Sequence, residues 1–209
     1  SDRCYAYLQL EQYEQAIDDC TQAIRLGGDN TYDYLNRGWA HFEKGDNDAA
    51  IMDLTMSISL YSDDSLTYYD RGLVYAEQER YESAVSDFTK ALELDPEYVE
   101  AYNERARAFE MLGQEDKALA DYTDAIELHP EFDYPYYNRA RLYLLKGEQD
   151  KAIDDLDSYL KWSEDDAPGH TLLGFIYVRR REFDTALEHL NRAIELDPNY
   201  ARAYRERAA

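Results

Sequence analysis

A block of about 34 residues recurs along this chain in one register, and no other feature of the sequence constrains the fold as strongly. Five full windows align without an insertion, residues 1–30 fill the back of an earlier window, and residues 201–209 open a later one. The full windows are 31–64, 65–98, 99–132, 133–166 and 167–200. A fixed period in this range is typical of stacked two-helix units, none of which can bury its apolar face alone. We therefore predict an all-α solenoid of antiparallel helix pairs, forming a single domain over residues 1–209.

Window 65–98 shows how one unit is built. Its first half carries an apolar stripe at helical spacing, and its second half carries another. The two stripes are Tyr68, Gly72 and Tyr75, and then Ala84, Phe88 and Ala91. Glu79-Arg80 is the expected turn between the helices, and Asp95-Pro96 is the expected end of the second helix because proline does not continue a helix interior.

A small residue recurs on the first helix of every full window, four residues after a large one, which allows two helices to approach closely. These small residues are Gly38, Gly72, Ala106, Ala140 and Gly174. Small, aromatic and proline positions that recur together in this way resemble the tetratricopeptide repeat family, and the resemblance covers essentially the whole chain. It implies a right-handed superhelical solenoid whose first helices line a concave surface.

An arginine in the first helix is followed sixteen residues later by an aspartate in the second helix, in five successive windows. The arginines are Arg3, Arg37, Arg71, Arg105 and Arg139, and the aspartates are Asp19, Asp53, Asp87, Asp121 and Asp155. In the sixth window both positions change together, to Leu173 and His189. We interpret each pair as an ion pair between the two helices of a repeat, so these arginines are poor candidates for ligand binding.

The two cysteines, Cys4 and Cys20, both fall on core-facing positions of the first window. Two cysteines in a chain of this length are not a disulfide framework, so we expect buried free thiols. The alternative is a disulfide between the two helices of that window, because the two positions face each other.

The balance of 45 acidic against 22 basic residues gives a net charge of −23. This charge argues against nucleic acid and against anionic membrane surfaces as partners, since both are bound through Lys and Arg. The sequence has no stretch of roughly 20 apolar residues and no visible signal peptide. We therefore expect a soluble, cytoplasmic protein, with a removed targeting segment as the alternative left open.

The candidate partner-binding residues lie on the stripe of each first helix that faces away from its own repeat. This stripe is rich in aromatic residues and arginine, which interface hot spots favour. The predicted residues are Asn36, Trp39, Tyr69, Asp70, Asn103, Arg107, Tyr137, Asn138, Arg141 and Phe175. Acidic residues in the middle of the stripe suit a partner with a basic segment. One tetratricopeptide subtype clamps the carboxyl tails of chaperones with a Lys/Asn/Lys/Arg set, and the corresponding positions here lack that set.

Nothing in the sequence indicates catalysis or a cofactor. No two of the four histidines share a helix at metal-ligand spacing, no glycine-rich phosphate loop occurs, and the Asp-rich segments lack the EF-hand pattern. We predict a non-enzymatic scaffold without cofactor or metal, which binds a peptide or helix segment of a partner protein in the concave groove. The alternatives are a module that self-associates end to end through exposed solenoid ends, and an accessory segment of a larger enzyme.

Overall fold

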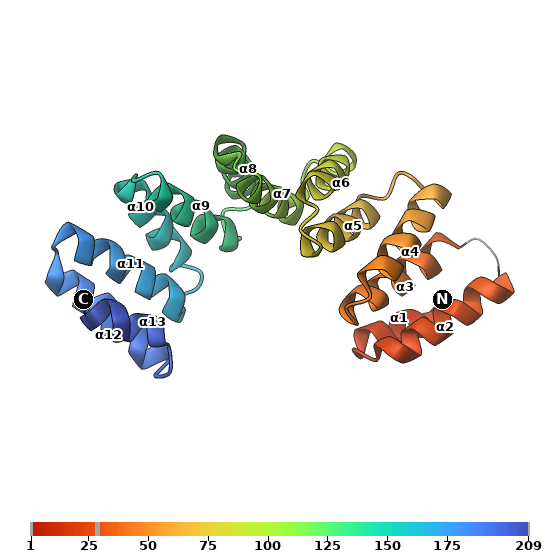
Figure 1. Cartoon of the computed structure of the whole chain (residues 1–209), viewed down its shortest axis with the longest axis horizontal. Coiled ribbons are helices and arrows are strands. Elements are labelled where there is room, and N and C mark those ends of the chain that lie inside the picture. The colour runs from red at the N-terminus through yellow and green to blue at the C-terminus, as the bar shows by residue number, and fades with distance from the viewer. Residues whose placement is uncertain (1, 28–29, 209) are drawn as a thin grey trace. The chain divides into compact units, whose positions relative to one another are not determined.

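The computed structural model describes residues 2–27 and 30–208, and this part of the chain consists of helices and short connections without a strand (Figure 1). The chain divides into two compact units, unit 1 (residues 1–114) and unit 2 (residues 115–209). The boundary falls inside window 99–132, between its two helices. The all-α class predicted from the repeat is confirmed.

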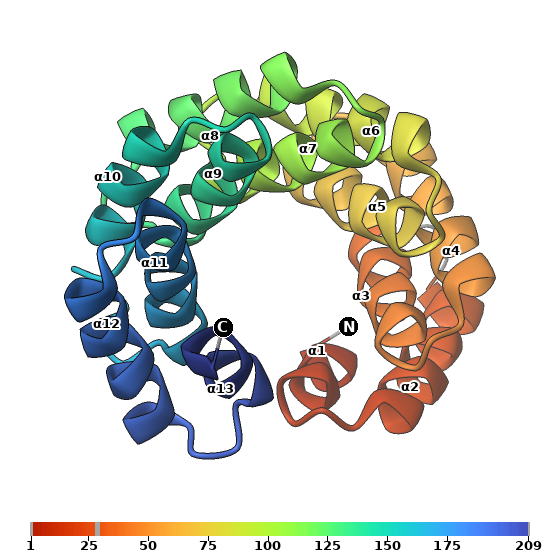
Figure 2. The ribbon, with the colours of Figure 1, turned by 60° about the vertical axis from the view of Figure 1, so that its left-hand side comes forward.

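Unit 1 contains three helix pairs and one further helix. Its helices are α1 (Asp2–Gln9), α2 (Tyr13–Gly27), α3 (Thr31–Glu43), α4 (Asn47–Leu60), α5 (Ser65–Glu77), α6 (Tyr81–Leu94) and α7 (Val99–Met111). Within this unit, α1, α3, α5 and α7 form one layer and α2, α4 and α6 form the other (Figure 2). Helices α3, α5 and α7 begin at Thr31, Ser65 and Val99, which is the spacing that the sequence period predicts.

Unit 2 repeats the same arrangement. Its helices are α8 (Glu115–Leu128), α9 (Tyr134–Leu145), α10 (Gln149–Tyr159), α11 (Ala167–Arg180), α12 (Phe183–Leu196) and α13 (Ala201–Ala208). Helix α9 packs against α8 and α10, and α11 packs against α10, α12 and α13. The organisation of both units as a single domain, and its superhelical hand, stay predictions.

The small residues of the first helices are required by the closeness of the second helices. A Cβ atom on Gly72 would lie 2.6 Å from a ring carbon of Phe88, and one on Gly174 would lie 2.5 Å from Cγ of Leu190. A Cβ atom on Gly38 would lie 2.9 Å from Cγ of Leu54. Real Cβ atoms do not approach so closely, so the large side chain of the second helix occupies the space that the glycine leaves.

The turn inside each helix pair uses a left-handed residue at one fixed position of the repeat. This residue is Gly45, Gly113 or Gly147 in three turns, with φ between 69° and 79°. The same position holds Glu11, Glu79 and Arg181 in the other three turns, with φ between 55° and 62°. Glycine adopts this conformation without a steric cost, whereas the three residues with a Cβ atom hold it under strain.

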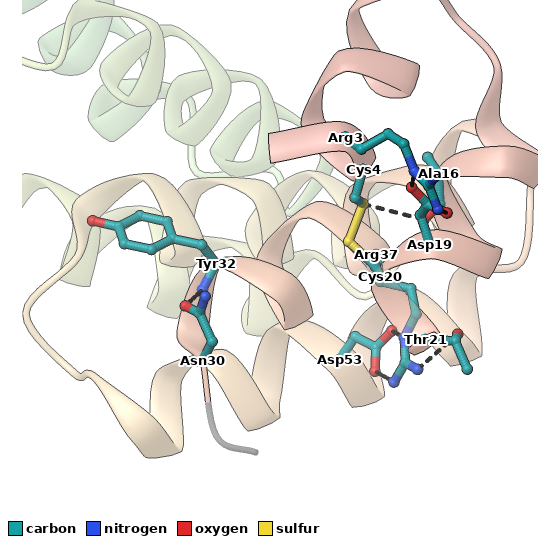
Figure 3. Close-up of a disulfide and its surroundings, with 10 residues drawn as sticks. All are labelled: Arg3, Cys4, Ala16, Asp19, Cys20, Thr21, Asn30, Tyr32, Arg37 and Asp53. Carbon is teal, nitrogen blue, oxygen red and sulfur yellow. Dashed lines mark hydrogen bonds and ion pairs between the residues drawn. A yellow bond between two sulfur atoms is a disulfide. The ribbon is translucent and has the colours of Figure 1, made fainter. Parts of the chain in front are cut away.

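The predicted ion pairs between the helices of a repeat are confirmed for four of the five windows. Arg37 donates from Nε and Nη2 to the two carboxylate oxygens of Asp53, both at 2.7 Å (Figure 3). Arg71 with Asp87, Arg139 with Asp155 and Arg3 with Asp19 form the same bidentate pairs. The expectation for Arg105 and Asp121, which lie in different units, stays a prediction.

Arg37, Arg71, Arg105 and Arg139 also contact the preceding repeat. Arg37 donates from Nη1 to the hydroxyl of Thr21 at 3.0 Å, and Arg71 donates to Thr55 at the same distance. Arg105 donates to Thr89, and Arg139 donates to Thr123. The guanidinium groups of Arg37, Arg71 and Arg139 therefore each join three helices, which fits the prediction that these arginines are poor candidates for ligand binding.

The expectation of two free cysteine thiols is wrong. Cys4 of α1 and Cys20 of α2 form a disulfide, and both residues are fully buried (Figure 3). Their positions in the repeat are those of Gly38 and Leu54, the small and large residues that touch in the next pair. A covalent bond thus joins the first two helices at the point where packing joins the helices of the other pairs.

Candidate functional site

The predicted partner-binding residues lie on one side of the first helices, beside the stripe that packs on the second helix of the same repeat. We call this side the first-helix face. Six of the ten predicted residues lie in unit 1, on α3, α5 and α7, and four lie in unit 2, on α9 and α11.

The centre of the first-helix face in unit 1 is the half-buried ring of Tyr69. Its centroid lies 4.8 Å from the ring of Tyr98, which precedes α7, and 5.7 Å from the ring of Phe88 on α6. Burial raises the pKa of the Tyr69 phenol, and the negative charge of Glu104 is the next cause. The tyrosine is therefore a fixed, neutral aromatic surface at physiological pH.

Asp70, the next residue of α5, is buried, with only 7% of its surface exposed. Its burial raises the pKa of the carboxyl group to about 8, and the negative charge of Asp64 adds to the effect. The negative charge of Asp70 also raises the pKa of the Tyr69 phenol and of the Tyr98 phenol.

A third group lies on α7, where Glu104 connects two predicted residues. The side-chain amide of Asn103 donates to Oε1 of Glu104 at 3.0 Å, and Arg107 donates from Nη1 to Oε2 at 2.8 Å. Asn103 is buried, whereas the side chain of Arg107 is 59% exposed. Glu104 and Tyr98 were not among the predicted site residues. Glu104 is one of the acidic residues in the middle of the predicted stripe, one repeat after Asp70.

The two predicted residues of α3 are both half-buried. The Trp39 ring packs against Phe42 of the same helix, with the centroids 5.2 Å apart. In the described part of the chain, neither Asn36 nor Trp39 shares a hydrogen bond or ring contact with Tyr69.

Unit 2 has a tyrosine at the position of Tyr69, but in different electrostatic surroundings. The ring of Tyr137 on α9 packs against Tyr159 of α10, with the centroids 5.2 Å apart. Burial raises the pKa of its phenol, and the positive charge of Arg141 opposes the rise. Arg141 is exposed and Asn138 is partly buried. Phe175 on α11 lies under the guanidinium of Arg179, which is 5.2 Å from the ring centroid.

Within residues 2–27 and 30–208, no group of three or more His, Cys, Asp or Glu side chains is placed to hold a metal ion. In the same part of the chain, none of the helices has both the length and the apolar composition needed to cross a lipid bilayer.

The two histidines of the last full repeat make contact. His170 and His189 approach through their Nδ1 atoms at 3.0 Å, and the His189 ring stacks on Tyr177. Burial lowers the pKa of His189, with His170 as the next cause. His189 takes the aspartate position of the other repeats and the buried Leu173 takes the arginine position, whereas His170 takes the position of a tyrosine such as Tyr68.

Comparison with known families and structures defines the class of the protein. A family model described as tetratricopeptide repeat matches residues 2–55 and 69–131, and two further models of the same description match residues 121–154 and 167–200. This chain belongs to the tetratricopeptide repeat family. No curated protein is significantly similar to it in sequence.

Solved structures of several repeat proteins are similar to this chain. PilW, a type IV pilus biogenesis factor, has a TM-score of 0.86 at 20% identity, covering 98% of this chain and 95% of PilW. YrrB, described as having an unusual peptide-binding site, has a TM-score of 0.72 at 22% identity, covering 91% of this chain and 98% of YrrB. MamA from Desulfovibrio magneticus RS-1 has a TM-score of 0.74 at 24% identity, covering 83% of this chain and 98% of the MamA chain. At these identities the likeness shows the fold alone.

Proposed function

We propose that this protein is a non-enzymatic interaction scaffold that binds a peptide or helix segment of a partner protein on its first-helix face. The observation that carries the proposal is the set of aromatic and polar side chains that the first helices hold in fixed positions at the surface. Tyr69 is held by Tyr98 and Phe88, and Tyr137 is held by Tyr159. Rigid aromatic side chains are favoured at interfaces because little conformational entropy is lost when they bind.

The family supports the same function. Tetratricopeptide repeats present preformed surfaces that are built from neighbouring helices, and their curvature creates extended binding faces. YrrB, which has the same fold, is described as having a peptide-binding site. A first-helix face that is preformed here would pay only a small ordering cost on binding a segment of a partner.

The test is capture of partner proteins from the source lysate by the wild-type protein and by the Tyr69→Ala/Tyr137→Ala/Arg141→Ala variant. The matched control is Met52→Ala/Phe183→Ala/Leu187→Ala, which removes exposed apolar side chains from the second helices α4 and α12. We expect mass spectrometry to identify proteins that the wild type and the control retain and that the first-helix variant loses. Identical sets of bound proteins from all three would contradict the proposal, provided that circular dichroism shows three folded proteins.

Self-association is the second candidate, and exposed apolar residues near the N-terminal helix pair favour it. Tyr5, Leu10 and Leu26 are all exposed in unit 1. Sedimentation velocity over a hundredfold concentration range distinguishes the two functions. A mass that rises with concentration, and that falls back in a Tyr5→Ser/Leu10→Ser/Leu26→Ser variant, would support self-association. A constant monomer mass would exclude it.

A further inference from the structure

The buried carboxylate of Asp70 lacks a partner of opposite charge in unit 1. Only 7% of the surface of Asp70 is exposed. Among the described residues, no hydrogen bond and no ion pair reaches its side chain. Burying a carboxylate without compensation is costly, and buried charges in proteins are normally paired. The groups whose charges act on it are the carboxyl of Asp64 and the phenols of Tyr69 and Tyr98. None of these is a cation.

The surroundings of Asp70 combine aromatic rings with negative charge. The Tyr69 and Tyr98 rings pack at 4.8 Å, and the charges of Asp70, Glu100 and Glu104 all act on Tyr69. Arg107 is a cation in the same group, but it is ion-paired with Glu104 at 2.8 Å. A positively charged group placed against a tyrosine face and a carboxylate is attracted by both the ring quadrupole and the charge.

We propose that Asp70 and the Tyr69–Tyr98 ring pair bind the ammonium or guanidinium group of a lysine or arginine side chain in the partner segment, an inference that rests on the proposed function. The cation completes the ion pair that Asp70 lacks, while the two rings cover the aliphatic stem of the lysine or arginine. Burial raises the pKa of Asp70 to about 8, so most of this carboxyl group is protonated at neutral pH while no cation is bound. A bound ammonium or guanidinium group favours the ionised form, so binding lowers this pKa and releases the proton.

The arrangement also predicts which side chains are rejected. A neutral side chain at this position leaves the carboxyl group without a charged partner, and an acidic side chain adds repulsion from Asp64, Asp70 and Glu104. In unit 2 the corresponding position holds Asn138, next to the exposed Arg141, so this selectivity belongs to unit 1.

The experiment uses a phage-displayed library of random dodecapeptides as the probe, selected in parallel on the full chain and on the Asp70→Asn variant. The control is Glu93→Gln, which makes the same carboxylate-to-amide change at an exposed position of α6. We expect the wild type and the control to enrich peptides with Lys or Arg at one fixed position, and the variant to lose that enrichment while it still selects peptides.

A second measurement leaves the protein unchanged. For the most enriched peptide, the Kd is measured by fluorescence anisotropy before and after its lysine or arginine is replaced by norleucine. We expect the replacement to weaken binding to the wild type at least tenfold and to weaken binding to Asp70→Asn much less, which is the signature of direct coupling.

Selection of the same Lys- or Arg-containing peptides by Asp70→Asn, or of wild-type peptides without a basic position, would overturn the Asp70 inference and leave the scaffold function intact. Failure of the wild type to select any peptide would overturn both proposals. The library result and the norleucine result therefore distinguish failure of the Asp70 inference from failure of the proposed scaffold function.

Discussion

Tyr69 in unit 1 and Tyr137 in unit 2 occupy the same position of the repeat, and their surroundings differ mainly in charge. Both rings are half-buried, both pack against another tyrosine of their own repeat, and burial raises the pKa of both phenols. Glu104 is the main charge that acts on Tyr69, whereas Arg141 is the main charge that acts on Tyr137. The aromatic anchor is thus part of the repeat, and the residues around it set the charge that a partner meets.

This comparison separates positions that the fold dictates from positions that are free to vary. The Arg–Asp ion pair recurs in both units because it connects the helices of a repeat, and its loss in window 167–200 is matched by Leu173 and His189. The residue after the tyrosine is Asp70 in unit 1 and Asn138 in unit 2, although α5 and α9 are both first helices of their repeats. Recognition can therefore change without a change in the scaffold.

The largest expected effect comes from breaking an ion pair in unit 1. Arg71→Met leaves the Asp87 carboxylate buried without its cation, and we expect the free energy of unfolding to fall by about 3–5 kcal/mol. The measurement is urea denaturation followed by Trp39 fluorescence in a Trp162→Phe background, because each unit contains one of the two tryptophans.

The control for this prediction gives unit 1 the two residues that the last full repeat of unit 2 has at the positions of the ion pair. Arg71→Leu/Asp87→His reproduces the Leu173/His189 combination and removes both charges together, so it should cost less than Arg71→Met alone. A double variant as unstable as the single variant would show that the pair is needed for its geometry and not for charge compensation.

The next effect concerns the disulfide, which joins two helices of unit 1. Breaking a bond between residues sixteen apart in sequence should destabilise unit 1 by about 3 kcal/mol, because the unfolded chain gains conformational freedom. We expect Cys4→Ser/Cys20→Ser to show this loss by Trp39 fluorescence, while the Trp162 signal of unit 2 is unchanged.

Cys4→Ala/Cys20→Leu is the matched control. It introduces the residue types that Ala140 and Leu156 provide at the same positions of another repeat, so it should recover part of the lost stability. Two free thiols in a titration of the purified, non-reduced protein would contradict the disulfide. Disulfides persist in oxidising compartments, so the bond weighs against the cytoplasmic location expected from the sequence.

A smaller effect tests the charge difference between the two tyrosine sites. The folded-state pKa of Asp70, about 8, lies above the ordinary value of 3.8, so the folded protein retains a proton that the unfolded chain releases. The stability from this proton is complete below pH 3.8 and is lost as the pH rises through 8. Between pH 7 and pH 9, the wild type should lose about 1.4 kcal/mol relative to Asp70→Asn.

The neighbouring phenols do not obscure this measurement, because burial raises the pKa values of Tyr69 and Tyr98 away from the same pH range. Urea denaturation of both proteins at pH 7, 8 and 9 provides the comparison. Asn138→Asp should introduce a weaker pH dependence of the same sign into unit 2, since Asn138 is less buried and Arg141 is close. Parallel stability curves for the wild type and Asp70→Asn would contradict the prediction.

The smallest effect concerns the left-handed residue of the turns. Glu79→Gly in unit 1 should raise the free energy of unfolding by about 0.5–1 kcal/mol, because glycine adopts the positive φ without steric cost. Gly147→Glu, the reciprocal change in unit 2, should lower it by a similar amount. Thermal unfolding of the two variants measures both changes. Equal stability of the wild type, Glu79→Gly and Gly147→Glu would show that the turn carries no strain.

The parts of the structure that could be predicted from the sequence are those that recur with the repeat. Because Arg71 and Asp87 have counterparts in neighbouring windows, chance spacing was an unlikely source of the pattern and contact could be inferred. The threonines that accept from the same arginines recur in the same register, from Thr21 to Thr123, and could have been found in the same way.

Features that occur once were not predictable by this reasoning. The repeat placed Cys4 opposite Cys20, but whether the two thiols are oxidised to a disulfide depends on redox conditions, which the sequence spacing does not record. The burial of Asp70 depends on how the repeat packs around it. Sequence reasoning placed Asp70 on the binding stripe, but it could not show that the carboxylate lacks a cation.

The disulfide has a mechanical consequence for the first helix pair. When tension acts on the chain from its N-terminal side, the bond carries the load directly from Cys4 to Cys20, so the loop between them cannot be pulled out. The loop would otherwise add about 55 Å of extended chain for sixteen residues. Under oxidising conditions the force passes to α2 and to its packing against α3, and under reducing conditions α1 is the first element to unravel.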